Sequence, residues 1–481
     1  MVFFYIRRKK YTFTQINGII WIDLYKFFFL MVMCVLNYRL VIFICKIIYK
    51  MVKLLHLNGG NVLGNIGLKL NKHLLRKFKI SGKVIAVTGT NGKTSTTNII
   101  KNILETSGSK VLCNSEGNNL NTGIASLLIK NSDLNGNIKC DYLVLETDEH
   151  YVPIVYKDLK LDSFVVLNFF RDQLDRTAET EILIKNISKF LSTYNNNLIL
   201  NADDPNVLRL ASANKNNENI YYYNVSKTIY AQDHMIDTGE GKFCPECGTR
   251  LEYEYYQYSH IGRFKCPKCN FGKIKPNVTL EVKNPKEGKF KYKNKTFHTK
   301  YNTIYTMYNI AACILTSTLY NIDTDIISVA IKNFELKNGR LETIMINNEI
   351  TILNLAKNPA GSNATINFIN QDEEEKELMF VLNDNTADGK DVSWIWDVNF
   401  NILNNVSRII TSGTRAYDAA VRIKNSGYDY KKIECYPNIE EAVEKLYVNK
   451  NKKYIIFNYT AVTKTRNAVI EYKNRVDNND I

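Results

Sequence analysis

One short segment has the residue types of a phosphate-binding loop. It consists of Gly89, Thr90, Asn91, Gly92, Lys93, Thr94 and Ser95. The glycines let backbone N–H groups turn inward around phosphate oxygens, Lys93 supplies a positive charge, and the Thr94 hydroxyl can ligate Mg²⁺. The segment keeps the GK[ST] ending of such loops, although it is shorter than the GxxxxGK[ST] form. We therefore predict that it binds the phosphates of a nucleotide.

The sequence on either side of this loop supports the prediction. The β-rich run KVIAV at residues 83–87 precedes the loop, and the helical pattern NIIKNILETSG at residues 98–108 follows it. Strand, loop and helix in this order bring the positive end of the helix dipole to the phosphates. The alternative is a glycine-rich turn that binds nothing, and the order of the elements argues against it.

Acidic residues follow the next apolar run, at residues 142–145. Glu146 ends this run, and Asp148 and Glu149 come shortly after it. A carboxylate at the carboxyl end of a parallel strand, beside a phosphate loop, is well placed to hold Mg²⁺ directly or through water. We predict that Glu146 and Thr94 bind magnesium and that Lys93 and Glu146 are catalytic. The alternative for Glu146 is a solvated acid at a strand end.

Four of the ten cysteines form two Cys-x-x-Cys pairs, which are separated by 18 residues. The four residues are Cys244, Cys247, Cys266 and Cys269. Four thiolates at this spacing are typical of a tetrahedral zinc site with no open position, so we predict a structural zinc ribbon over residues 242–275. The alternatives are disulfides and a nucleic-acid-binding ribbon. The other six cysteines are scattered, which is typical of a reducing cytoplasm.

The elements that must position these residues form an α/β pattern. Short apolar runs alternate with segments long enough for helices, which predicts a parallel sheet covered on both faces. The runs lie at residues 83–87, 110–113, 142–145, 164–167 and 197–200. A second α/β domain is expected from Gly339, with apolar runs at 378–382, 408–411 and 454–457. We expect a nucleotide-binding domain over 51–338 and a C-terminal α/β domain over 339–481.

Bulk composition sets wide limits. A chain of 481 residues is long enough for two or three domains, and 45% hydrophobic with 23% charged residues is close to the average for soluble globular proteins. The net charge of +15 would attract nucleic acid, anionic lipid or a phosphorylated substrate. Charge alone does not distinguish these three.

The first 50 residues form an apolar extension. Residues 27–48 are strongly apolar, but Arg39 and Lys46 interrupt them, so the stretch is marginal as a membrane span. Three interpretations stay open: a helix on the membrane surface, a weak anchor, or codons upstream of the true start. A secretory cleavage site is not recognisable, which makes secretion unexpected.

Several motifs together resemble those of the Mur ligase family. GTNGKTSTTN at 89–98 is similar to the ATP loop of these enzymes, and Asn201–Pro205 (NADDP) is similar to a segment near their adenine site. Asn309 and Gly339–Glu342 (GRLE) resemble later signatures of the same central domain. The resemblance implies binding of ATP and Mg²⁺ and adds Asn201 and Arg340 to the nucleotide-binding residues.

The zinc ribbon narrows the resemblance to one branch of the family. Together with residues 168–176, 355–364 and 382–397, it is similar to the synthetase subunits of lipid II isoglutaminyl synthases. The resemblance covers roughly residues 50–475. It implies a cytoplasmic enzyme, at the inner face of the membrane, that amidates the α-carboxylate of D-glutamate in the lipid II stem peptide. ATP would activate the carboxylate as an acyl phosphate, and ammonia would displace the phosphate.

The resemblance also implies a partner. Ammonia would come from a GatD-type glutaminase subunit, and Asp391 is expected to complete the active site of that partner. Asp384 and Asp388 lie close enough in sequence to compete for this role, and a turn-forming or capping Asp is the alternative.

Two other functions remain possible from the sequence. A Mur-type ligase that adds an amino acid, as in folylpolyglutamate or cyanophycin synthesis, would share the ATP loop but need no glutaminase. A nucleic-acid-binding protein could use the ribbon and the positive charge. It would leave the ATP-site motifs without a role, so we expect no nucleic-acid partner.

Overall fold

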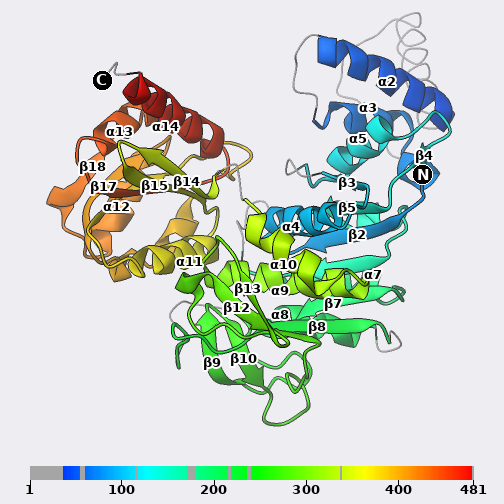
Figure 1. The fold of residues 1–481 in the computed structure, drawn as a ribbon, viewed down its shortest axis with the longest axis horizontal. Helices are drawn as coiled ribbons and strands as arrows, with labels where there is room; N and C mark the ends of the chain where they lie inside the picture. Colours follow the sequence, from blue (N-terminus) through cyan, green and yellow to red (C-terminus); the bar gives the residue numbers. More distant parts are fainter. Residues whose placement is uncertain are drawn as a thin grey trace, which may run out of the picture.

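Two separate β-sheets organise the computed structural model (Figure 1). The structure describes residues 36–54, 60–114, 118–171, 180–214, 218–235, 240–335 and 339–478. The first sheet lies in the N-terminal two thirds of the chain, and the second lies after residue 339. This arrangement confirms the predicted α/β fold class.

The first sheet has seven strands, and every neighbouring pair is parallel. In spatial order they are β11 (Val278–Leu280), β8 (Ile220–Val225), β7 (Asn197–Asn201), β6 (Ser163–Val166), β2 (Lys83–Thr88), β5 (Tyr142–Glu146) and β3 (Val111–Cys113). Five of these strands coincide with the apolar runs predicted from the sequence. Because β2 lies between β5 and β6, the loop that follows β2 emerges near the middle of the sheet, beside the end of β5.

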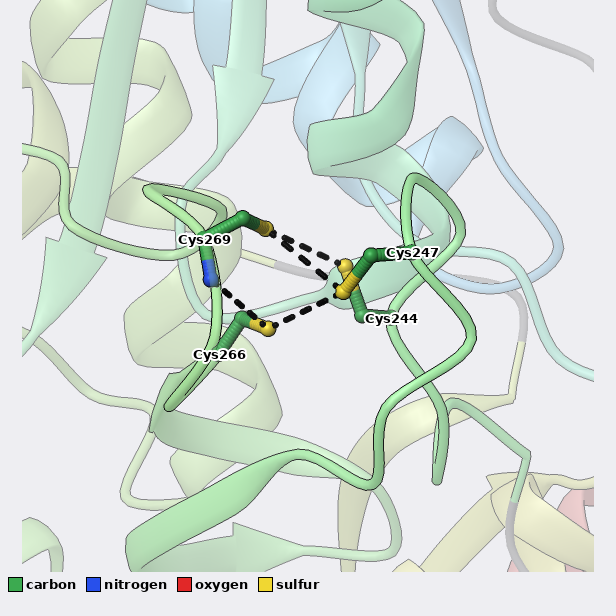
Figure 2. Close-up of side chains that lie close together, drawn as sticks. All are labelled: Cys244, Cys247, Cys266 and Cys269. Atoms are coloured by element: carbon green, nitrogen blue, oxygen red, sulfur yellow. Dashed lines mark hydrogen bonds between the residues drawn. The ribbon is translucent and has the colours of Figure 1, made fainter.

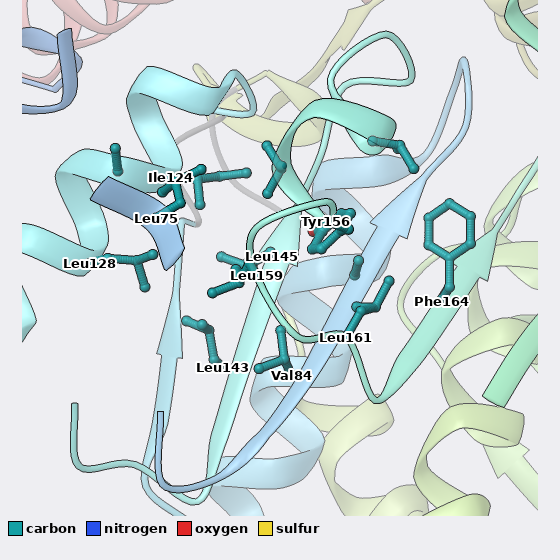
Figure 3. Packing of buried hydrophobic residues seen from close by; sticks show 14 of the residues in the cluster. Leu75, Val84, Ile124, Leu128, Leu143, Leu145, Tyr156, Leu159, Leu161 and Phe164 are labelled. Carbon is teal, nitrogen blue, oxygen red and sulfur yellow. The ribbon is translucent and has the colours of Figure 1, made fainter. Parts of the chain in front are cut away.

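Alternate residues of each strand point to opposite faces of this sheet. Val84 and Ala86 of β2 belong to one buried cluster, which also includes residues of α5 (Asn121–Asn131) and α7 (Thr180–Leu191); Figure 3 shows part of it. Ile85 and Val87 belong to a second cluster, under α4 (Lys93–Thr106), α9 (Ile304–Leu319) and α10 (Thr324–Asn333). Burial on both faces explains why the strands are continuous apolar runs and not alternating ones.

An inserted β-rich module follows β8. It contains the hairpin of β9 (Glu252–Tyr258) and β10 (Ile261–Lys265), and the cysteine pairs lie on either side of this hairpin. The backbone N–H of Gly262 donates to the carbonyl of Asp203 at 2.9 Å, which ties the hairpin to the end of β7. A second hairpin, β12 (Lys289–Tyr292) with β13 (Lys295–His298), precedes α9.

The second sheet has six strands. In spatial order they are β14 (Arg340–Ile346), β15 (Glu349–Leu355), β19 (Lys452–Phe457), β16 (Lys376–Val381), β17 (Val406–Ser412) and β18 (Ile433–Cys435). Only the β14–β15 pair is antiparallel. Helices α11 (Pro359–Asn370), α12 (Ala416–Asn425), α13 (Ile439–Leu446) and α14 (Ala461–Asp477) flank this sheet.

The described chain begins with two helices, α2 (Tyr38–Leu54) and α3 (Val62–Leu70), which lie beside α5 (Figure 1). Of the apolar stretch at 27–48, residues 27–35 lie outside the described residues. Among the helices that the structure describes, none combines the length and the apolar character needed to span a bilayer.

Candidate functional site

A cavity of about 380 Å³ lies where the two sheets meet. On the side of the first sheet, the cavity is lined by the predicted phosphate-binding loop, Glu146 and Asn309. On the side of the second sheet, it is lined by Arg340 and Lys357. Six of the seven predicted loop residues, from Thr90 to Ser95, face this cavity. The carboxyl ends of parallel strands are where ligands bind in open α/β sheets.

The backbone of the loop requires its glycine at position 92. Gly92 has a φ of 88°, in the left-handed region, and it precedes the first residue of α4. A Cβ atom at this position would lie 2.4 Å from Oδ1 of Asn309. Asn168 holds the loop from the other side, because its Oδ1 accepts from the backbone N–H of Asn91 at 2.9 Å and its Nδ2 donates to the Asn91 carbonyl at 3.0 Å. The loop is therefore fixed in a conformation that directs the start of α4 toward the cavity.

Lys93 forms a buried ion pair that the sequence did not predict. Its Nζ atom lies 3.0 and 3.1 Å from the two carboxylate oxygens of Glu149, and it also donates to the carbonyl oxygens of Gly89 and Thr90. Both side chains are less than 10% exposed. Burial raises the pKa of Glu149, and the charge of Lys93 opposes this shift. The acids after β5 were visible in the sequence, but only the fold shows that Glu149 contacts Lys93.

Arg340 brings the second sheet to the loop. Its Nη2 atom donates to the Thr94 hydroxyl at 3.1 Å. Burial lowers the pKa of Arg340, and the nearby carboxylate of Glu146 opposes that shift. Glu146 is 3% exposed, and its Oε1 accepts from Nδ2 of Asn119 at 3.1 Å. Among the described residues, none donates a hydrogen bond to the other oxygen, Oε2, although it is buried.

A buried carboxylate oxygen with this environment suits a hard cation. Glu146 and Thr94 both line the cavity beside the loop, and oxygen ligands are those that Mg²⁺ prefers. The donor set present is therefore compatible with Mg²⁺, and the assignment of Glu146 and Thr94 as its ligands stays a prediction.

Asp148 is a further acid in the cavity wall. Burial would raise its pKa, but the hydrogen bond from His150 and the charge of Lys93 outweigh burial and hold the pKa at about 2. The Nδ1 atom of His150 lies 3.3 Å from Oδ1 of Asp148. Asp148 is therefore ionised at neutral pH and adds negative charge beside the predicted metal ligands.

Asn358 also contacts the loop, although no function was predicted for it from the sequence. Its Nδ2 donates to Oδ1 of Asn91 at 3.1 Å, so a side chain at the start of α11 reaches the tip of the loop. Asn91 and Asn358 are 267 positions apart in sequence. Such a contact leaves no local signal, so neither spacing nor periodicity could have identified it.

Asn201, predicted to approach the nucleotide, is placed elsewhere. It is 1% exposed and is absent from the lining of the cavity described above. Its Nδ2 donates to the carbonyl of Leu167 at 3.1 Å, and its Oδ1 accepts from the N–H of Asp203 at 3.0 Å. In this structure the side chain organises the turn after β7, and a nucleotide contact by Asn201 stays a prediction.

The three acids considered for the partner's active site differ in their surroundings. Asp388 is 2% exposed and accepts from the N–H of Thr460 at 2.8 Å. Asp384 is paired with Nε of Arg415 at 3.0 Å. Asp391 is exposed, and its Oδ1 accepts from the N–H of Ser393 at 2.8 Å, which lowers its pKa. Asp391 is therefore the acid of the three that is ionised and exposed on the surface.

The four predicted zinc ligands meet at one point (Figure 2). The Sγ atoms of Cys244 and Cys269 are 3.6 Å apart, and those of Cys247 and Cys266 are 3.5 Å apart. A tetrahedral zinc site with Zn–S bonds of about 2.3 Å requires sulfur atoms about 3.8 Å apart. All four Sγ atoms lie within 4.8 Å of one another, so the cluster is compatible with one zinc ion and two knuckles.

Two family models match the chain. The model for the Mur ligase middle domain matches residues 87–267, which include the loop, Glu146 and three of the four clustered cysteines. The model for the MurT ligase C-terminal domain matches residues 355–462, which include Asn358 and the three acids. The cavity therefore lies between segments that both match Mur-type ligases.

Solved structures support the fold. A pseudomurein peptide ligase type C from Methanothermus fervidus superposes with a TM-score of 0.63 and 24% identity, covering 84% of this chain and 81% of that one. The likeness shows a shared Mur ligase fold.

Relatives with assigned names show the family. The chain is 33% identical over 411 residues to the lipid II isoglutaminyl synthase (glutamine-hydrolyzing) subunit MurT of Staphylococcus aureus strain COL, covering 84% of this chain and 91% of the relative. It is 30% identical over 423 residues to the subunit of the same name from Streptococcus pneumoniae, covering 85% and 92%. The chain therefore belongs to the Mur ligase family and, within it, to the MurT subunits.

Proposed function

We propose that this chain is the ATP-dependent ligase subunit that converts the α-carboxylate of D-glutamate in the lipid II stem peptide to an amide, giving D-isoglutamine. The observation that carries the proposal is the convergence of Lys93, Arg340 and the buried Glu146 carboxylate on one cavity. Membership of the MurT subunits supplies the substrate class. A ligase that adds an amino acid, or a nucleic-acid-binding protein, is not favoured by these relatives.

The reaction has two steps. An oxygen of the substrate carboxylate attacks the γ-phosphorus of ATP, the bond to the β-phosphate oxygen breaks, and an acyl phosphate and ADP result. Ammonia then attacks the acyl carbon, phosphate leaves, and loss of a proton gives the amide. Lys93 and Arg340 stabilise negative charge on the transferred phosphoryl group, and the loop backbone positions it.

The metal assignments are part of the proposal. Thr94 and Glu146 would hold Mg²⁺, which neutralises phosphate charge when bound. The four cysteines would hold a structural zinc ion. We propose the boundaries 51–338 and 339–481 for the two main domains, with the ribbon at 242–275 inserted in the first.

The partner is proposed to be a GatD-type glutaminase that supplies ammonia and uses Asp391. The exposed, ionised state of Asp391 supports this role, because an acid that orients a histidine in a partner must be accessible and charged. We place the complex in the cytoplasm, at the inner face of the membrane that carries its lipid-linked substrate.

The test is co-expression with a glutaminase from the same genome, followed by mass spectrometry of a muropeptide substrate. Amidation replaces OH by NH₂ and lowers the mass by about one unit. Asp391→Asn should abolish glutamine-dependent amidation and leave amidation with free ammonia intact. Asp384→Asn is the matched control and should retain both activities. An unchanged muropeptide mass with both nitrogen sources would refute the proposal.

A further inference from the structure

The outer side of α2 carries a row of exposed apolar side chains. The row comprises Leu40 (46% exposed), Phe43 (47%), Ile47 (44%), Met51 (57%) and Leu54 (81%). Their spacing of three or four residues places them on one face of the helix. On the opposite face, Val41, Ile42 and Cys45 are fully buried in the cluster that also contains residues of α5. The helix is therefore apolar on two sides, and within the part of the chain that the structure describes only one of them is packed against the protein.

The charged residues of α2 itself are all basic. The sequence contains no acidic residue between Asp23 and Glu105. Arg39, Lys50 and Lys53 of α2 are exposed and, by the helical period, lie along one flank of the apolar row. Basic side chains beside an exposed apolar row on a helix are the pattern of an interfacial amphipathic helix.

We infer that this face of α2 lies on an anionic membrane surface, with its axis parallel to the bilayer and its apolar row among the acyl chains. Negatively charged lipid headgroups complement the basic flank. A second copy of the chain would bring two helices of equal positive charge together, which electrostatic complementarity disfavours.

The position of α2 suggests a function for the membrane contact, which is to hold the cavity near a lipid-linked substrate. Helix α2 packs on α3, and Asn61, the residue that precedes α3, lines the cavity. In Figure 1 both helices lie at the same end of the molecule, beside α5. A membrane held against α2 would therefore be connected, through α3, to the part of the cavity wall that contains Asn61. This use rests on the proposed function, since it supposes a lipid-linked substrate.

The experiment measures binding of the full-length chain to vesicles by co-sedimentation. Vesicles of phosphatidylcholine with about 30% phosphatidylglycerol should bind the chain, and pure phosphatidylcholine should bind it about tenfold more weakly. Phe43→Asp/Ile47→Asp should weaken binding to the anionic vesicles about tenfold or more. The matched control is Ile182→Asp/Val329→Asp, which changes residues of similar exposure, 49% and 51%, on α7 and α10 and should bind as the wild type does.

A second variant keeps the test decisive if the first misfolds. Lys50→Gln/Lys53→Gln leaves the apolar row intact and should lower binding to anionic vesicles by about threefold to tenfold, with little change on neutral ones. Equal binding by the wild type and the α2 variants, or lack of binding by the wild type, would overturn the inference.

The two proposals can fail separately. Vesicle binding is measured without ATP, glutaminase or substrate, so its failure would leave amidation untouched. With a water-soluble muropeptide, Phe43→Asp/Ile47→Asp should amidate at the wild-type rate, whereas with lipid II in anionic vesicles its rate should fall. If the wild type binds vesicles but amidates neither substrate, the proposed function fails and the membrane contact stands.

Discussion

Two buried lysine–glutamate pairs occur among the described residues, one at the carboxyl ends of strands in the first sheet and one at the amino ends of strands in the second. Lys93 and Glu149 lie beyond the carboxyl ends of β2 and β5, and Lys93 lines the cavity. Lys453 and Glu377 lie at the amino ends of β19 and β16, with Nζ and Oε2 2.8 Å apart. The chemistry of the pairs is the same, but parallel sheets bind ligands at the carboxyl ends of their strands. From their positions in the sheets we therefore expect the first pair to serve the reaction and the second to serve the fold.

The surroundings of the two pairs agree with this distinction. Glu377 also accepts hydrogen bonds from Nε of Arg408 at 3.1 Å and from Nδ2 of Asn449 at 2.6 Å. Burial would raise the pKa of Glu377, but the hydrogen bonds from Arg408, Asn449 and Lys453 outweigh burial and lower it. The carboxylate is thus saturated by protein donors, as a structural ion pair requires.

Removal of Lys93 should have the largest effect. Lys93→Ala deletes the charge that stabilises the transferred phosphoryl group, so ADP formation should fall about 1000-fold or more. Glu146→Ala should give a similar loss. The fold should persist, because a buried Glu149 whose pKa is already raised can take up a proton. ADP release measures the loss of activity, and circular dichroism measures whether the fold persists. ATP turnover at the wild-type rate would contradict the proposed difference between the two ion pairs.

Glu377→Gln should reverse the pattern. The substitution removes the carboxylate that pairs with the buried Lys453 and leaves Arg408 with Glu434 as its paired acid. It should cost about 3–5 kcal/mol of unfolding free energy. Because the folded pKa of Glu377 is lowered, its stabilisation is present above the ordinary pKa and is lost as the pH falls through the folded value. The denaturation midpoints of wild type and variant should therefore differ at pH 7 and converge at acidic pH. ATP turnover at a temperature where the variant is folded should change little; a large loss would show that this pair also serves the reaction.

The cysteine cluster should give an intermediate effect. Cys266→Ser should remove the bound zinc and expose residues 242–275 to proteolysis, since a structural zinc site holds its module together. Tyr258 of the ribbon hairpin lines the cavity, so ATP turnover should fall, but less than in Lys93→Ala. Cys435→Ser is the control, because this cysteine lies outside the cluster. Inductively coupled plasma emission spectroscopy measures the zinc content. A wild-type protein without zinc would contradict the assignment of the four cysteines as zinc ligands.

The sequence was informative where function is local. The loop, the cysteine pairs and the buried strands each occupy a few consecutive residues whose types are dictated by backbone geometry or ligand chemistry. The contacts of Lys93 with Glu149, of Thr94 with Arg340 and of Asn91 with Asn358 depend on how separate segments pack, so they were not predictable. The NADDP segment shows that a local motif can also mislead. It resembles a nucleotide-contacting segment, but in this structure it is buried around the turn after β7.

Asp203 of that segment should show the smallest effect, because it is a buried acid that accepts hydrogen bonds from two neutral groups, the Tyr308 hydroxyl and the Val225 N–H. Its Oδ2 accepts from the Tyr308 hydroxyl at 2.7 Å, and burial raises its pKa to about 7. The unfolded side chain ionises near pH 4, so the folded state binds the extra proton between these values, and stability falls as the pH rises from about 4 to about 7. Asp203→Asn resembles the protonated acid and should remove this decline, so that its melting temperature exceeds that of the wild type by a few degrees at pH 8 and by less at pH 5. A variant that is less stable than the wild type at pH 8 would show that the ionised carboxylate is stabilised after all, as that of Glu377 is by its donors.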